Sequence, residues 1–185
     1  MDTALDKALE IFWHRGYAAA PIQEICVAMD LNPGSVYAAF GNKHGLFVKV
    51  VQRYLDQMNR PGVDLMDAEP DGLRGIRAYF EFIVEGIVNG NRRWGCLGTN
   101  AFLELKENDA EVGRLMSDHL GRLEQAFCRA LDRTGIEDAA GNAKYLLCLS
   151  QGLNVIAKTD PDRSTLRNIV EMALLPFARQ EPLVS

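Results

Sequence analysis

Short apolar groups at helical spacing mark two helices near the start of the chain. One group predicts a helix over residues 3–15 that ends at Gly16, since glycine commonly follows the last turn of a helix. The other gives residues 22–29 an apolar face of about two turns. Helices this short need neighbours, so we expect both to contribute to one small core. Their apolar positions are Leu5, Ala8, Leu9, Phe12, Ile22, Ile25, Cys26 and Met29.

A third helix is predicted from its start signal. Asn32 can accept hydrogen bonds from open backbone amides, and Pro33 fits the first helical position, where its missing N–H has no partner to lose. The helix then covers residues 33–40. Val36 and Phe40 are four residues apart and should face inward together. The residues turned outward are Gly34, Ser35, Tyr37 and Ala38.

A fourth helix should follow almost at once. Gly41 ends the third helix and Asn42 caps the next, which opens with Lys43. It is expected to run to residue 59, where the sequence Arg-Pro-Gly at 60–62 stops it. A helix pair joined by a tight turn, with a helix on either side, has the shape of a motif that enters a DNA groove.

The remainder of the chain is also predicted to be helical. Residues 61–71 are rich in Pro, Gly and Asp and predict a loop, and residues 92–100 predict an irregular segment. No run alternates between apolar and polar residues as a strand would, so we expect an all-α protein. Helices are predicted over residues 72–89, 100–107, 109–133, 137–157 and 162–178.

The last two predicted helices carry more apolar residues than one partner helix could cover. Such a face either packs inside its own domain or joins two copies of the chain. We expect a four-helix interface between two copies under twofold symmetry. The residues of this face are Ala139, Ala143, Leu146, Leu147, Ser150, Leu153 and Asn154 on one helix, and Leu166, Ile169, Val170, Ala173 and Leu174 on the other.

Composition and charge change this picture little. The 185 residues include 48% hydrophobic and 24% charged ones, ordinary values for a globular protein. The net charge of -5 is not typical of nucleic-acid binding, and residues 1–60 are neutral, with six Lys/Arg and six Asp/Glu. No apolar run has membrane-spanning length and no signal peptide is evident, so a cytoplasmic location is expected. Four scattered cysteines without a CxxC pair fit a reducing compartment, and no metal or cofactor is expected.

The segment Ser35-Val36-Tyr37-Ala38-Ala39-Phe40, followed by Lys43 and then Leu-Phe at 46–47, resembles the DNA-binding motif of TetR-like bacterial transcriptional regulators. The likeness is strong up to residue 50, and only the layout is similar beyond it. It implies a helix-turn-helix DNA-binding domain at residues 1–47 and a helical ligand-binding and dimerisation domain at residues 48–185. It also implies a homodimer that binds a double-stranded DNA operator, most often a repressor released by a small molecule or an electrophile.

Six residues are candidates for contact with DNA. By resemblance, Tyr37 contacts a phosphate, and Gly34 and Ser35 lie close to base edges. Lys43 is in the first turn of its helix, where a cation opposes the helix dipole and gains from a nearby phosphate. The plainer alternatives are a tyrosine at the edge of the core and a solvated lysine. No Arg or Lys occurs between residues 21 and 42, so base choice depends on other side chains and on DNA shape. The candidates are Asn32, Gly34, Ser35, Tyr37, Ala38 and Lys43.

A second local motif, Gly95-Cys96-Leu97 with Asn100 after it, is similar to a TetR-like subgroup that includes repressors of N-ethylmaleimide reductase type. Some members of that subgroup respond to reactive electrophiles. The arginines at 92–93 would lower the pKa of a neighbouring thiol and favour such chemistry. The alternative is a small buried cysteine in a tight bend.

An apolar pocket in the second domain is a further prediction, because helical domains of this layout often enclose a cavity. A small hydrophobic or weakly polar effector would suit such a pocket. The alternative is that each lining residue only packs in the hydrophobic core. The candidate ligand-binding or sensing residues are Cys96, Trp94, Phe80, Val84, Phe102, Met116, Leu120, Phe127 and Tyr145.

Two other classes of protein remain as alternatives, an enzyme and a helical interaction protein without DNA binding. None of the three histidines has the spacing to a cysteine or carboxylate that is typical of a nucleophilic or metal site, and no glycine-rich phosphate loop follows a strand. We therefore expect that the protein is not an enzyme. An interaction protein would leave the positions of Tyr37 and Lys43 without an explanation.

Overall fold

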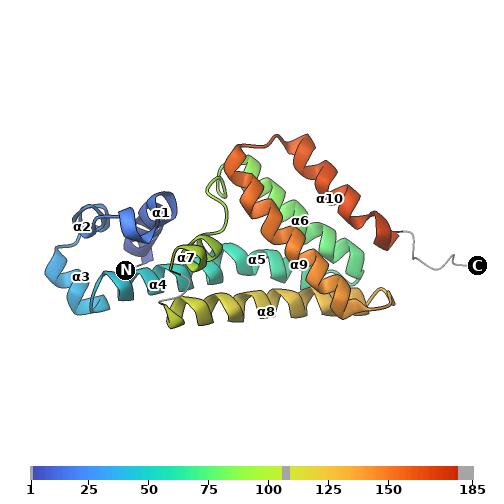
Figure 1. Cartoon of the computed structure of the whole chain (residues 1–185), viewed down its shortest axis with the longest axis horizontal. Helices are drawn as coiled ribbons and strands as arrows, with labels where there is room; N and C mark the ends of the chain where they lie inside the picture. Colours follow the sequence, from blue (N-terminus) through green and yellow to red (C-terminus); the bar gives the residue numbers. More distant parts are fainter. Residues whose placement is uncertain (1, 106–108, 179–185) are drawn as a thin grey trace, which may run out of the picture. The chain divides into compact units, whose positions relative to one another are not determined.

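The computed structural model describes residues 2–105 and 109–178, and all regular structure in these ranges is helical (Figure 1). The predicted all-α fold is confirmed. The chain forms two compact units. The first comprises Met1–Met58 and Leu97–Ser117, and the second comprises Asn59–Cys96 and Asp118–Ser185. A DNA-binding domain limited to residues 1–47 stays a prediction.

The first unit is built around aromatic contacts between α1 and α4. Phe12 meets Phe47 edge-on, with ring centroids 4.9 Å apart, and Trp13 meets Tyr54 at the same distance. Such edge-to-face pairs add to the stabilisation from apolar burial. The helices of this unit are α1 (Asp2–Ala19), α2 (Ile22–Met29), α3 (Pro33–Phe40), α4 (Lys43–Tyr54), α7 (Leu97–Leu105) and the beginning of α8 (Ala110–Asp132).

The start of α1 agrees with its pattern, but its end does not. Gly16, expected to end the helix, has φ 79° and ψ 174°, and regular helix resumes after it to Ala19. A residue with a side chain would be strained at this positive φ. The glycine therefore breaks the helix without ending it, and leaves the backbone amides of the next residues open for other partners.

The largest difference from the sequence prediction lies at residues 55–71. A π-helical segment, Leu55–Asn59, follows α4 and leads directly into α5 (Arg60–Ala68), where a loop was predicted. Pro61 is tolerated because it lies in the first turn of α5, where its N–H would have no helical partner. Gly62 is buried, and a Cβ there would lie 2.7 Å from the Phe82 ring, so this glycine serves helix packing.

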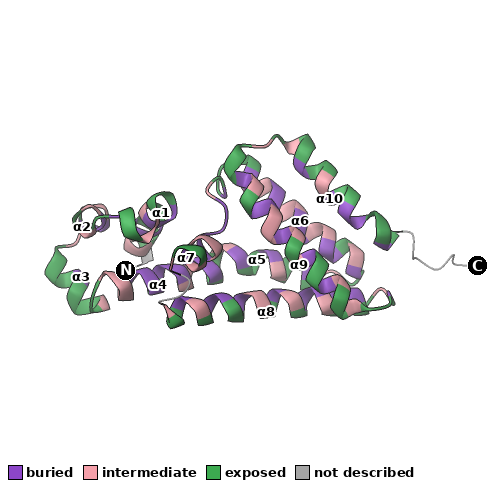
Figure 2. Ribbon diagram, viewed as in Figure 1, coloured by how far each residue is buried: buried purple, intermediate pink, exposed green. Residues whose placement is uncertain are grey.

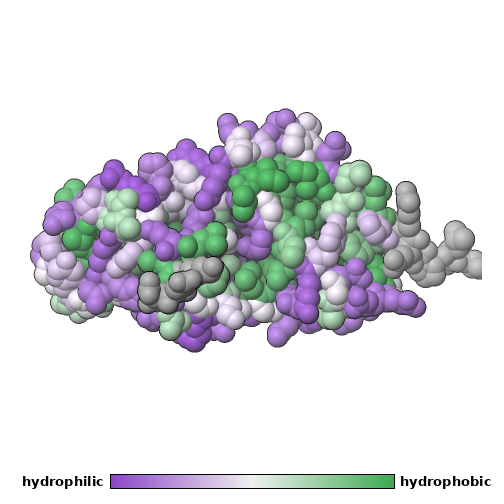
Figure 3. Space-filling model, viewed as in Figure 1, coloured by the Kyte–Doolittle hydropathy of each residue, from purple (hydrophilic) through white to green (hydrophobic). Residues whose placement is uncertain are grey.

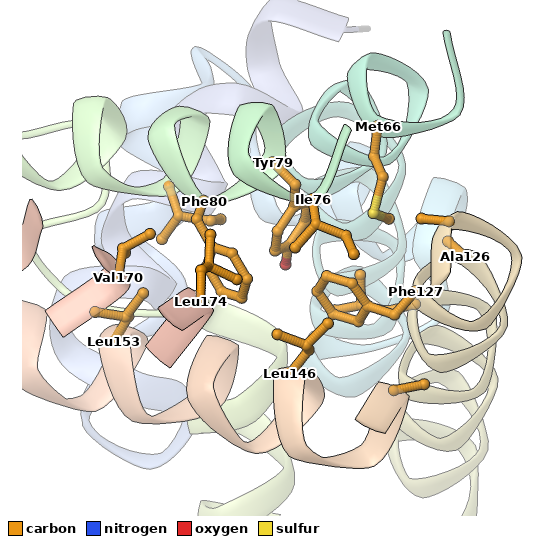
Figure 4. Close-up of a cluster of buried hydrophobic side chains, with 14 of the residues drawn as sticks. Met66, Ile76, Tyr79, Phe80, Ala126, Phe127, Leu146, Leu153, Val170 and Leu174 are labelled. Atoms are coloured by element: carbon orange, nitrogen blue, oxygen red, sulfur yellow. The ribbon is translucent and has the colours of Figure 1, made fainter. Parts of the chain in front are cut away.

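The second unit encloses the larger hydrophobic core, drawn in Figure 4. Tyr79 and Phe80 of α6 point toward Phe127 of α8, and Phe80 stacks on Phe127 with centroids 5.7 Å apart. Leu146 of α9 and Leu174 of α10 close the cluster from the other side. The elements of this unit are α5, α6 (Gly72–Val88), the remainder of α8, α9 (Ala139–Ile156), a 3-10 turn (Ala157–Thr159) and α10 (Arg163–Ala178).

The apolar face predicted on the last two helices is largely internal. Most of its residues are buried in the core of the second unit, where α10 packs on α6 and the Tyr79 hydroxyl of α6 meets the Ser150 hydroxyl of α9 (Figure 2). The apolar side chains that these helices do expose are different ones, and Figure 3 shows a hydrophobic surface over this region. They are Tyr145, Val155, Met172 and Leu175. None of the helices in the described ranges is long and apolar enough to cross a membrane.

Candidate nucleic-acid interface

The orientation of α3 is fixed by its first turn and by one buried side chain. The side-chain oxygen of Asn32 accepts a hydrogen bond from the backbone amide of Ser35 at 2.8 Å, and Pro33 occupies the first turn. Val36 is fully buried, which determines the face that the helix turns outward. Tyr37 exposes 43% of its surface. The exposed residues of this face are Gly34, Ser35, Tyr37 and Ala38, as predicted.

α4 begins against the end of α3. Gly41, with φ 79°, makes the turn, and the Asn42 side-chain oxygen accepts from the Gly45 amide at 2.8 Å. A Cβ on Gly45 would lie 2.1 Å from the carbonyl oxygen of Phe40, so glycine is required at this close approach. The first turn of α4 is therefore held against the end of α3. Helix starts of this kind attract anions such as phosphate.

Lys43, in that first turn, is held by an aromatic ring. Its ammonium nitrogen lies 4.6 Å from the centre of the Tyr17 ring, within the range of a cation–π contact. Burial lowers the pKa of Lys43 from its ordinary value, while the carboxylate of Glu104 acts in the opposite direction. Lys43 is therefore an oriented cation and not a freely solvated side chain.

His44, the next residue, is tied to the start of α8. Its Nε2 lies 2.5 Å from a carboxylate oxygen of Asp109, whose other oxygen accepts from the amides of Glu111 and Val112 at 3.1 Å. Partial burial would raise the pKa of Asp109, but the hydrogen bonds from Val112 and His44 outweigh it, and the pKa is lowered. This carboxylate both caps α8 and holds the first turn of α4.

A buried polar cluster in the second unit was not predicted as a site. Arg92 is only 2% exposed and donates to the side-chain oxygen of Asn59 at 3.0 Å. The amide nitrogen of Asn59 lies 3.2 Å from Nε2 of His119 and 3.9 Å from Sγ of Cys96. The sequence placed Arg92 near Cys96, but burial of the guanidinium follows from contacts between distant segments. Its stacking on Phe82, at 5.2 Å, is one of them.

The side chains of this cluster predict a pH dependence of stability. Burial, with the charges of Arg122 and Arg92, lowers the pKa of His119 from 6.5 to about 4. Between these values the unfolded chain binds a proton that the folded chain does not. The free energy of unfolding should therefore decrease as the pH falls from about 6.5 to 4, by up to about 3 kcal/mol.

Urea unfolding at several pH values tests this dependence. A His119→Gln variant keeps an acceptor for the Asn59 amide but does not titrate, so its stability should fall much less across the same window. Identical pH profiles for the two proteins would contradict the assignment to His119.

The predicted pocket residues belong to both units. Phe80, Val84 and Phe127 lie together in the packed core of the second unit. Trp94 is half-buried, with the Arg93 guanidinium 4.4 Å from its ring centre. The remaining residues are distributed over both units. Phe102 and Met116 belong to the first unit, and half-buried Leu120 and exposed Tyr145 belong to the second.

Two of the exposed apolar side chains, Tyr145 of α9 and Met172 of α10, line a shallow groove. The Tyr145 hydroxyl reaches the Ala173 carbonyl oxygen at 3.4 Å across the two helices. Met172 is 66% exposed beside it. The groove is lined by Tyr145, Leu149, Asn168, Ile169, Met172 and Ala173.

Known proteins are similar to this chain both in the helix-turn-helix region and along the rest of its length. The model of bacterial regulatory proteins of the tetR family matches residues 4–50, which span α1 to α3 and most of α4. The transcriptional repressor DhaR of Mycobacterium sp. (strain GP1) is 30% identical over 183 residues, covering 93% of this chain and 90% of DhaR. The chain belongs to the TetR family of bacterial regulatory proteins.

Two further relatives match almost the whole chain. The transcriptional repressor ComR of Escherichia coli (strain K12) is 28% identical over 180 residues, covering 93% of this chain and 84% of ComR. A solved structure of CifR with cysteine substitutions, in complex with 26-base-pair operator DNA, is 30% identical with a TM-score of 0.78, covering 98% of this chain and 96% of CifR. The predicted family is confirmed. As a TetR-family regulator the chain is not an enzyme.

Proposed function

We propose that this TetR-family regulator is a repressor that binds operator DNA as a homodimer in the cytoplasm and leaves it when an effector binds. One observation carries the proposal: α3 presents an exposed face with the hydroxyl groups of Ser35 and Tyr37, whose orientation is set by the buried Val36 and the Asn32 cap. The relatives DhaR and ComR are transcriptional repressors, and the related CifR structure contains operator DNA.

The exposed residues of α3 suit distinct contacts in a major groove. Gly34 and Ser35 lie in the first turn, the part of a recognition helix that reaches base edges, and Ala38 offers a methyl group to thymine. Tyr37 and Lys43 suit phosphate contacts, since one offers a hydroxyl and the other a charge. Asn32, which caps α3 and is exposed, orients this surface.

The exposed apolar groove of α9 and α10 suits contact with a second copy of the chain. Its side chains leave apolar area open to water in the single chain, which a twofold partner would cover. Two DNA-binding heads, the helix-turn-helix domain of each copy, would then reach half-sites roughly 34 Å apart, which is one turn of DNA.

Selection from a random duplex library tests operator binding. The full-length protein, immobilised through a C-terminal tag, should enrich a palindromic sequence, and labelled duplexes carrying that sequence should bind more tightly than scrambled ones. A library that shows no enrichment after repeated rounds, with protein that is folded and dimeric, would overturn the proposal. An enriched sequence without twofold symmetry would instead contradict the dimeric mode.

The effector site is proposed in the second unit, with Cys96 as its reactive or sensing group. The thiol lies beside the Asn59 amide in the buried polar cluster, so an adduct there would displace groups that Arg92 and His119 also contact. The core of the same unit contains Phe80, Val84 and Phe127, which we propose as its apolar lining, and Trp94 and Leu120 also belong to this unit. Tyr145, Phe102 and Met116 stay predictions.

Mass spectrometry after brief treatment with N-ethylmaleimide tests the role of Cys96. Cys148 is exposed and Cys96 is buried, so accessibility alone would favour Cys148. If Cys96 is the sensing group, it should be modified before Cys148, and its modification should accompany release of the operator. A Cys148→Ser variant provides the matched control. If only Cys148 is labelled and Cys96 stays unmodified, Cys96 has a packing role and is not a sensor.

A further inference from the structure

The break in α1 is filled by a carboxylate from a distant part of the sequence. The backbone amides of Tyr17 and Ala18 donate to the two carboxylate oxygens of Glu104 in α7, each at 2.8 Å. These amides are available because Gly16 interrupts the helix. The fit is close, since a Cβ on Gly16 would lie 2.8 Å from the Glu104 oxygen. One side chain of α7 therefore fixes the backbone of α1 on either side of Tyr17.

The ring of Tyr17 supports Lys43. It packs against Phe47 of α4, with centroids 4.9 Å apart, and carries the Lys43 ammonium 4.6 Å from its centre. The Glu104 carboxylate also attracts that ammonium. The contacts form a continuous chain from Glu104 through the Tyr17 backbone and ring to Lys43, and these three residues all belong to the first unit.

We propose that Glu104 is a positioning residue for DNA binding, which sets the location of the Lys43 ammonium by anchoring Tyr17. The proposal rests on the proposed function, in which Lys43 contacts a phosphate. An oriented cation loses less conformational freedom when it meets the phosphate than a solvated lysine does. Loss of the anchor leaves the Tyr17 ring and the ammonium with more freedom, and the phosphate contact weakens.

The negative charge of Glu104 acts on DNA binding in the opposite direction to its positioning role. A carboxylate near the duplex repels phosphate, so its removal alone would strengthen binding. Glu104 is exposed, and salt near 0.15 M largely screens such repulsion at distances beyond about 8 Å. At that salt concentration we expect the loss of position to exceed the gain from the lost charge.

A double-mutant cycle tests whether Glu104 acts through Lys43. The probe is a fluorescein-labelled duplex that carries the sequence enriched by the wild-type protein, and anisotropy gives Kd at several salt concentrations. Glu104→Ala should weaken binding about tenfold in the wild-type background and less than about twofold in a Lys43→Ala background. It should also lower the slope of log K against log salt by up to about 0.9 for each head.

Two further variants and a folding control make the result unambiguous. Glu111→Ala removes an exposed carboxylate from the same unit without touching α1, and should leave Kd nearly unchanged. Glu104→Gln keeps one acceptor for the two amides and should weaken binding by an intermediate factor. Circular dichroism of each variant shows whether the first unit is folded, and if Glu104→Ala is not, Glu104→Gln carries the cycle.

The outcomes separate this inference from the function on which it rests. If the wild-type protein binds the selected duplex but Glu104→Ala weakens it equally in both Lys43 backgrounds, Glu104 has only a structural role. Tighter binding by Glu104→Ala would show that charge dominates, and would overturn the proposal as well. If the wild-type protein binds no duplex, the proposed function itself fails.

Discussion

Replacement of both Met172 and Leu175 by glutamate is expected to convert the dimer to monomers and to weaken operator binding at least about a hundredfold. The two side chains are exposed by 66% and 42% and lie one turn apart on α10. In a twofold interface the new charges of both copies would be buried without partners. A monomer also loses the gain from binding with two heads, which is typically a factor of a hundred or more.

Light scattering after gel filtration, together with anisotropy on the selected operator, measures both effects. Leu65→Glu is the matched control, because Leu65 is a 48% exposed leucine on α5 and should tolerate the charge without loss of the dimer. A double-glutamate variant that remains dimeric would show that the copies meet through another surface.

Combined Tyr37→Phe and Lys43→Ala substitutions should weaken binding to operator and scrambled duplexes alike, by about 30-fold. Phosphate contacts carry no base information, so specificity should be retained. The two residues differ in one respect. Loss of the Lys43 charge should lower the salt slope by about 0.9 for each head, whereas loss of the neutral Tyr37 hydroxyl should leave the slope unchanged.

The single variants and a lysine control separate these effects. Lys49→Ala removes an exposed lysine from the same helix, away from its first turn, and should change Kd far less than Lys43→Ala. If Lys43→Ala leaves the salt slope at the wild-type value, Lys43 does not contact a phosphate. A Tyr37→Phe variant with wild-type affinity would likewise exclude its hydroxyl from the interface.

Local sequence signals predicted the helix-turn-helix region well. Asn32 and Asn42 cap α3 and α4 as expected, because a cap depends on a side chain and an amide three residues apart. Asp30, which follows α2, adopts the left-handed conformation with φ 56°, which aspartate tolerates in turns. The burial of Val36 follows from helical spacing alone. These features depend on residues that are neighbours in the sequence.

Signals that depend on distant contacts failed or were absent. Pro61 and Gly62 predicted a stop, but Gly62 is needed where α5 packs on Phe82 of α6, and no local pattern contains that information. Periodicity found the apolar faces of α9 and α10 but could not separate a face that packs internally from one that meets a second copy. The carboxylate anchor of Glu104 joins residues more than 80 positions apart and leaves no local pattern.

The same limit applies to the sensing region. The Gly-Cys-Leu segment drew attention to Cys96, and the positive φ of Gly95, 75°, agrees with a tight bend. A Cβ on Gly95 would lie 2.4 Å from the carbonyl oxygen of Asn154 in α9, so the bend is also a packing site. Asn59 and His119, which complete the polar cluster, come from separate elements that no local pattern connects.

Hydroxyl-radical footprinting with methylation interference on the selected operator tests the central claim, that α3 and the start of α4 read DNA in a twofold arrangement. The wild-type protein should protect two stretches on one side of the duplex with centres roughly 34 Å apart, and major-groove methylation within them should block binding. Ser35→Ala should change the interference pattern only inside these stretches. Protection without twofold symmetry, or an interference pattern that is insensitive to Ser35, would contradict the account.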